Sequence, residues 1–248
     1  MKKDFFILWL AGLVGAVAIL PYAFTLQHEI LAKAGPPLPI IILASIAQTA
    51  VLLAIAVFFG LKLAARLKLS VLKLFDSNIT VKEKLTSFAV LTISMGIATA
   101  VLITLGDSLF GLYLPNLAVA NSQVAMWKTL LASIYGGVVE EILLRLFVMS
   151  FFAWILGKMF RQTEIIKNNW IMWMAIIVAS VLFGLGHLPI TSSLTAITPL
   201  VVLRAIVLNG IGGIVFGWLY WKKGLEYAIA AHFSADVVLL SLLPALLK

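Results

Sequence analysis

The sequence predicts an all-α fold: a polytopic transmembrane helical bundle with about seven spans and room for an eighth. Composition is the first reason, because 63% of the 248 residues are hydrophobic and 11% are charged. A soluble domain averages roughly 25% charged residues. The mean hydropathy of +1.13 agrees with a membrane protein. The third observation is a succession of long apolar runs. The absence of cysteine excludes disulfides, thiolate metal sites and cysteine nucleophiles.

The apolar runs define the spans in order. A helix needs about 20 apolar residues to cross a hydrocarbon core about 30 Å thick. Seven segments meet this length, at about 5–24, 39–61, 86–106, 129–157, 170–187, 199–221 and 226–247. The segment 107–128 is irregular, with Pro115 and Asn116, and a re-entrant or interfacial helix there would be the eighth.

The chain is predicted to form one membrane domain with two parts. Residues 1–128 hold the N-terminal spans and a basic, leucine-rich linker at about 62–85, which suits a helix on the membrane surface. Residues 129–248 form a helical core that carries the polar motifs. The N-terminus begins like a signal peptide, but its apolar sequence continues through Phe24, so we interpret it as an uncleaved first span.

The basic residues predict the orientation. With the N-terminus in the cytoplasm, thirteen of them fall on inside segments: Lys2, Lys3, Lys62, Arg66, Lys68, Lys73, Lys82, Lys84, Lys158, Arg161, Lys167, Lys222 and Lys223. Three fall outside: Lys33, Lys128 and Lys248. Positive charge marks cytoplasmic loops, so we expect an integral protein of the cell (cytoplasmic) membrane with its N-terminus inside. The net charge of +8 therefore gives no support to nucleic acid as a partner.

Two adjacent glutamates and an arginine interrupt the fourth predicted span. A charged side chain at bilayer depth costs at least ~2.5–3.5 kcal/mol, so such residues indicate a functional site. Arg145 lies one helical turn after Glu141 and can pair with it, whereas Glu140 points about 100° away. Gly136 and Gly137 allow a neighbouring helix to approach. A structural ion pair would explain Glu141 and Arg145 but would leave Glu140 without a role.

Histidines and an aspartate interrupt two further spans. Phe183 and His187 are spaced i, i+4 near the end of the fifth span, and His232 and Asp236 have the same spacing in the seventh. Clustering these side chains with Glu140 would remove them all from lipid at once. Upright helices place His187 near the outer end of its span and His232 about 9 Å from the inner end. We therefore expect tilted helices, or boundaries that differ by a turn or more. Arg204 lies alone in the sixth span.

Two chemistries fit such a cluster. His187 and His232 could hold Zn²⁺ together with a carboxylate and a water. Alternatively, Glu140 could act as the general base on a water while the histidines donate hydrogen bonds to the oxyanion. Both predict hydrolysis by an activated water, and we favour a site that works without a tightly held metal because protonation relieves the excess negative charge.

The three motifs together resemble a known family. Glu-Glu-x-x-x-Arg at 140–145, Phe-x-x-x-His at 183–187 and His-x-x-x-Asp at 232–236 resemble those of the CPBP family, which comprises CAAX proteases and bacteriocin-processing enzymes and is also called Abi. The resemblance covers about 120–245. It implies an intramembrane endopeptidase whose catalytic centre is Glu140, His187, His232 and Asp236, with Glu141 and Arg145 in support. The family often has asparagine where this chain has Asp236, so the role of that position is open.

Other functions stay open. A non-catalytic membrane scaffold or bacteriocin-immunity protein of the same fold would bind a partner without cutting it. A proton-coupled transporter is disfavoured because inverted repeats and paired broken helices are not evident in the sequence. For an enzyme, the expected partners are the lipid bilayer and a membrane-associated peptide or protein, either a prenylated C-terminus, a peptide precursor or a membrane-anchored regulator.

Overall fold

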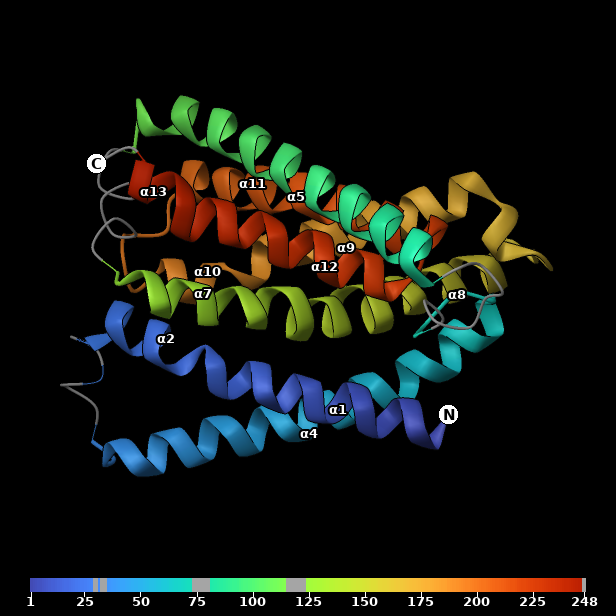
Figure 1. Ribbon diagram of the computed structural model, residues 1–248, viewed down its shortest axis with the longest axis horizontal. Helices are drawn as coiled ribbons and strands as arrows, with labels where there is room; N and C mark the ends of the chain where they lie inside the picture. Colours follow the sequence, from blue (N-terminus) through green and yellow to red (C-terminus); the bar gives the residue numbers. More distant parts are fainter. Residues whose placement is uncertain (29–30, 32–34, 73–80, 115–123, 247–248) are drawn as a thin grey trace.

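The chain folds into a bundle of long helices that run side by side (Figure 1). This computed structural model describes residues 1–28, 31, 35–72, 81–114 and 124–246. Within these ranges the regular structure is helical and no strand is present. The predicted all-α class is therefore confirmed for the described part of the chain.

Six helical stretches among the described residues are long and apolar enough to cross a membrane. They are Lys2–Leu26 (α1, Lys2–Ala18, and α2, Leu20–Leu26), Leu38–Leu67 (α4), Lys84–Gly111 (within α5, Val81–Gly111), Asn169–Thr191 (α9, Asn169–Gly186, and α10, Leu188–Thr191), Pro199–Lys222 (α11), and Leu225–Leu246 (α12, Leu225–Asp236, a π-helical stretch Val237–Leu242, and α13, Leu243–Leu246). These six match six of the seven predicted spans.

The remaining predicted span, 129–157, lies in a continuous helical stretch that carries the charged motif. It consists of α7 (Met126–Tyr135), π-helical η2 (Gly136–Glu140), π-helical η3 (Ile142–Met149) and α8 (Ser150–Met159). It is not among the six, and it carries two glutamates and an arginine within its length. It nevertheless runs within the bundle beside α1 and α4 (Figure 1).

Two irregular segments are only partly described. α4 continues to Leu67, so Lys62 and Arg66 belong to the end of a span and not to the linker expected at 62–85. Residues 73–80 of that linker lie outside the described part. In the segment 107–128, α5 extends to Gly111 and α7 begins at Met126, while 115–123 lie outside the described residues.

The helices approach closely where glycine faces them. α11 packs against α9, and Gly184 of α9 lies so near the backbone of Ala205 and Ile206 that a Cβ would be 2.5 Å from the Ile206 Cα. At another point of the same interface, Gly213 of α11 packs onto Ser180 of α9. α12 packs against α5, and α1 and α4 cover η2 and η3. Small residues at such contacts are how membrane helices gain close packing.

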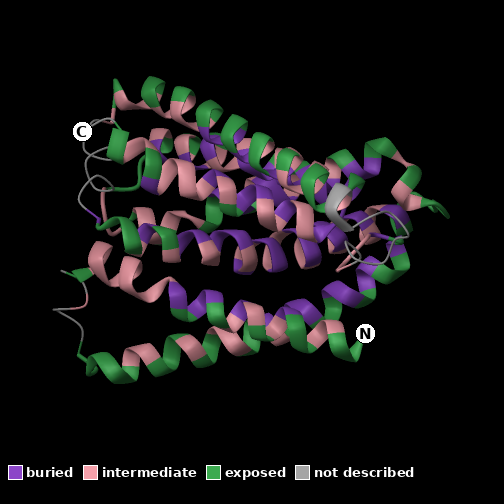
Figure 2. Cartoon of the chain, viewed as in Figure 1, coloured by how far each residue is buried: buried purple, intermediate pink, exposed green. Residues whose placement is uncertain are grey.

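Burial follows the layout of a membrane bundle. Buried residues gather along the inner faces of the helices, and exposed residues lie on the outer faces (Figure 2). Many of the exposed side chains are large and apolar, such as Leu43, Val90 and Leu105. In water such a surface would aggregate, whereas in a bilayer it faces lipid.

Candidate active site

The charged motif lies where the helix departs from α-helical geometry. Glu140 is the last residue of the π-helical stretch η2, and Glu141 separates it from η3. π-Helical turns occur inside α-helices chiefly at functional sites, because the extra residue changes the direction in which side chains point. Another π-helical stretch begins at Val237, directly after Asp236.

Glu141, Arg145 and His232 form a buried charged cluster. Arg145 Nη1 lies 2.9 Å from Glu141 Oε1, and the two side chains are almost fully buried. The same oxygen is 2.7 Å from His232 Nδ1. A carboxylate accepts hydrogen bonds, so His232 Nδ1 carries a proton and donates a hydrogen bond to Glu141. The predicted pairing of Glu141 with Arg145 is thus found, and His232 joins it from α12.

Two aromatic rings enclose this cluster. The Arg145 guanidinium carbon lies 4.9 Å from the ring centroid of Phe183 and 5.5 Å from that of Phe216. Phe216 also stacks on the His232 imidazole, with centroids 4.5 Å apart and planes 19° apart. The guanidinium Nη atoms and Glu141 Oε2 have no hydrogen-bond partner among the described residues. The ring faces therefore supply part of the stabilisation that hydrogen bonds do not.

Glu140 faces two imidazoles from different helices. Its Oε1 lies 3.9 Å from His187 Nε2, and its Oε2 lies 3.6 Å from His232 Nε2. His187 is held by a hydrogen bond between Nδ1 and the Phe183 carbonyl oxygen, 2.9 Å long. A carbonyl only accepts, so His187 Nδ1 is the donor and Nε2 is directed at Glu140. Polar groups more than 3.5 Å apart can be bridged by a water molecule that hydrogen-bonds to both.

Asp236 completes the group from one turn beyond His232. Its Oδ1 lies 3.7 Å from His232 Nε2. Gly136 of η2 makes room for it, since a Cβ there would collide with Asp236 Oδ2 and would lie 3.4 Å from His232 Nε2. The glycine predicted to admit a neighbouring helix therefore admits a carboxylate as well.

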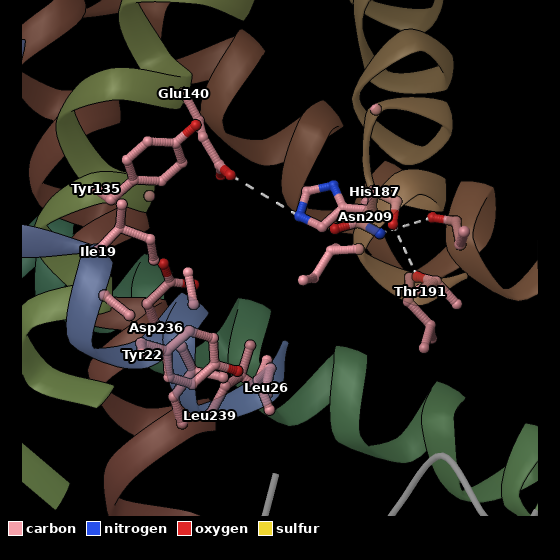
Figure 3. A pocket seen from close by; sticks show the side chains of 18 of the residues that line it. Ile19, Tyr22, Leu26, Tyr135, Glu140, His187, Thr191, Asn209, Asp236 and Leu239 are labelled. Carbon is pink, nitrogen blue, oxygen red and sulfur yellow. Dashed lines mark hydrogen bonds and ion pairs between the residues drawn. The ribbon is translucent and has the colours of Figure 1, made fainter. Parts of the chain in front are cut away.

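The four predicted site residues line one cavity of about 1050 Å³: Glu140, His187, His232 and Asp236. Glu140 and His187 point toward each other across it, and Tyr135 lies beside Glu140 (Figure 3). Asp236 and Tyr22 lie along another part of the wall (Figure 3). The helical span that holds His187 continues to Thr191, about one turn beyond the predicted end at 187. This correction places His187 inside the predicted membrane-spanning part, where it faces Glu140 as His232 does.

The cavity also contains residues that the sequence did not single out. Tyr135, Asn209, Phe216 and Asp107 lack the repeated i, i+4 spacing that marked the motifs. Arg204 is the single charged residue of the sixth predicted span, and its Nε lies 2.8 Å from Asp107 Oδ1 of α5. Asp107 lies 97 residues away from Arg204 in the sequence, so no local spacing linked the two residues.

A metal site needs three or more side-chain ligands that converge on one point. Among the described residues, no three His, Asp or Glu side chains are placed to hold a metal ion. Glu141 is already engaged by Arg145 and His232, and His232 Nδ1 is used in that contact. His187 and His232 each face Glu140 through Nε2, but no group of three described His, Asp or Glu side chains is arranged to hold a zinc ion.

Fold and site together define a polytopic membrane protein with a carboxylate–imidazole centre inside its bundle. Residues 122–238 match the family model described as Rce1-like, type II CAAX prenyl endopeptidase. The match spans all three motifs and supports the CPBP family of CAAX proteases, which these motifs resemble. This is a protease family, so the match supports a peptidase and a membrane-associated substrate. Comparisons with curated proteins and with solved structures gave no match.

Proposed function

We propose that the protein is an intramembrane endopeptidase that hydrolyses a peptide bond with a water activated by Glu140. The observation that carries the proposal is the position of the Glu140 carboxylate, which lies within 4 Å of Nε2 of both histidines in a cavity among membrane-spanning helices. Glutamate and imidazole are the usual groups for proton transfer in such reactions.

Each side chain has a role in this mechanism. Glu140 takes a proton from the water, whose oxygen attacks the carbonyl carbon of the substrate. His187 Nε2, an acceptor while Nδ1 donates to Phe183, orients the same water. His232 donates from Nε2 to the developing oxyanion when it is doubly protonated, a form that the Glu141 carboxylate at Nδ1 stabilises. Glu140 then passes its proton to the leaving nitrogen, so the carboxylate is restored.

Asp236 and Arg145 position these groups. Asp236 Oδ1 lies 3.7 Å from His232 Nε2, so it borders the nitrogen that we propose donates to the oxyanion. Arg145 supplies the positive charge beside the buried Glu141 side chain. The substrate we propose is a membrane-associated peptide or protein, with a prenylated C-terminus, a peptide precursor and a membrane-anchored regulator as the specific forms to compare.

The test is cleavage of a membrane-embedded fluorogenic peptide by purified protein in lipid. Glu140→Gln keeps the size of the side chain but removes the base, and we expect a loss of about 10²–10⁴-fold in kcat. Glu164→Gln is the matched control in the connection between α8 and α9. Its hydrogen bond from Lys167 lowers the pKa of Glu164, so this exposed glutamate is also a carboxylate at neutral pH.

The outcomes separate the enzyme from its alternatives. Cleavage by the wild type and by Glu164→Gln, with loss in Glu140→Gln, supports the peptidase. Binding of the peptide by all three without cleavage would favour the non-catalytic scaffold. Equal cleavage by Glu140→Gln and the wild type would exclude Glu140 as the base.

A further inference from the structure

The cavity is closed at one end of the bundle. Beyond His232 and Glu141, toward the end where α1 begins and α4 ends, the helices fill the interior with side chains of zero accessible surface: Ile142, Leu146, Leu219, Tyr220, Leu225 and Ala228. These residues come from η3, α11 and α12. They form a packed layer that separates the catalytic group from that end of the molecule.

In the other direction the cavity extends toward the ends of the helices. Side-chain exposure rises along this path, from 5% for His232 to 18% for Glu140, 32% for His187 and 35% for Asp107. The lining includes residues at or near the ends of four helices, Leu26 of α2, Gly111 of α5, Thr191 of α10 and Pro244 of α13. The cavity therefore opens at the end of the bundle opposite its packed layer.

Positive charge gathers at the closed end. The described basic residues at this end lie near the start of α1, the end of α4, the start of α5, the α8–α9 connection and the end of α11. They are Lys2, Lys3, Lys62, Arg66, Lys68, Lys84, Lys158, Arg161, Lys167, Lys222 and Lys223. At the open end the described residues include Lys128, and Arg204 is neutralised by Asp107. An excess of lysine and arginine marks the cytoplasmic side of a membrane protein.

We infer that the catalytic cavity opens to the extracytoplasmic side of the membrane and takes a peptide segment presented at that surface. The hydrolysis rests on the proposed function, but the direction of access does not. The outer part of the cavity fits a peptide backbone, because uncharged hydrogen-bonding side chains line it: Gln27, Ser45, Thr49, Ser108 and Asn209. Such an entrance favours an exported precursor over a protein whose processed end stays in the cytoplasm.

The absence of cysteine permits a direct test in the full chain. Single substitutions place one thiol at a time: Ser108→Cys and Asn209→Cys in the cavity wall, Ser192→Cys beside α10 at the open end, and Gln162→Cys in the α8–α9 connection. Spheroplasts are treated with a membrane-impermeant maleimide before or after lysis. The thiolate is the reacting form, so modification reports access of water as well as of the reagent.

We expect Ser192→Cys, Ser108→Cys and Asn209→Cys to be modified equally before and after lysis, and Gln162→Cys severalfold more after lysis. Modification of Gln162→Cys alone in intact spheroplasts would reverse the orientation and overturn the inference. Cavity thiols that react only after lysis, or never, while Ser192→Cys reacts at once would show that the cavity does not open on that side. The same variants carrying Glu140→Gln should label identically, so a failure of hydrolysis is distinguishable from a failure of access.

Discussion

The membrane-spanning helices contain two arginine–carboxylate pairs that differ in almost every respect. Arg145 and Glu141 lie one turn apart on the same helical stretch, with side chains 2% and 0% exposed. Arg204 and Asp107 come from α11 and α5, with side chains 21% and 35% exposed. The first pair lies against the packed layer behind Glu140 and its two histidines, whereas the second lines the open part of the cavity.

The difference shows how depth changes what an ion pair does. The Glu141 oxygen that contacts Arg145 also accepts the hydrogen bond from His232 Nδ1, so the buried pair sets the protonation and direction of a proposed catalytic imidazole. The pair in the cavity wall has no such third partner among the described residues. Removing one member should therefore have unequal consequences in the two places.

The largest effect on stability is expected from Arg145→Ala. The substitution leaves the Glu141 carboxylate buried without its cation, at a cost of about 3–5 kcal/mol. We expect a lower yield of folded protein and a lower unfolding temperature in detergent, together with lost activity. The matched variant is Arg204→Ala in the less buried pair. Equal stability of Arg145→Ala and the wild type would show that the buried pair does not hold the fold.

Glu141→Gln should affect activity more than folding. The amide keeps the shape and can still accept a hydrogen bond from His232 Nδ1, but it no longer favours the protonated imidazole. We expect kcat to fall by about 10–100-fold, as when carboxylates that orient histidines are removed from metal sites. Circular dichroism and thermal unfolding should show a folded protein. A variant as active as the wild type would remove Glu141 from the mechanism.

The pair in the cavity wall should respond mildly in stability. We expect Arg204→Ala to cost about 0.2–1 kcal/mol, the range of exposed pairs. Because both side chains line the cavity, the change should appear in KM before it appears in kcat. A cycle of Arg204→Ala, Asp107→Asn and the double variant measures the coupling. A coupling as large as that of the buried pair would contradict the contrast drawn between them.

The smallest effect is expected from chelation. No group of three described His, Asp or Glu side chains is arranged to hold zinc, and a water activated by Glu140 needs no metal. Treatment with a chelator should leave cleavage of the fluorogenic peptide unchanged. Metal analysis of the treated, active protein provides the check. Stoichiometric zinc whose removal abolishes activity and whose return restores it would overturn the metal-free mechanism.

The sequence alone determined what depends on spacing along one helix and on total hydrophobicity. Apolar runs of about 20 residues predicted the spans, since backbone groups in lipid must be satisfied within a helix. The i, i+4 spacing predicted the pair of Glu141 with Arg145 and left Glu140 free. Expensive charges in apolar runs indicated Glu140, His187, His232 and Asp236 before any geometry was known.

Tertiary structure decided everything that joins different helices. It paired Arg204 with Asp107 and stacked Phe216 on His232. It also brought His232 Nδ1 against Glu141, which the sequence had paired only with Arg145. None of these contacts has a characteristic spacing, because the partners are brought together by how helices pack and not by their distance along the chain. The direction in which the cavity opens likewise follows from which helix ends stay apart, and a hydropathy pattern carries no information about that.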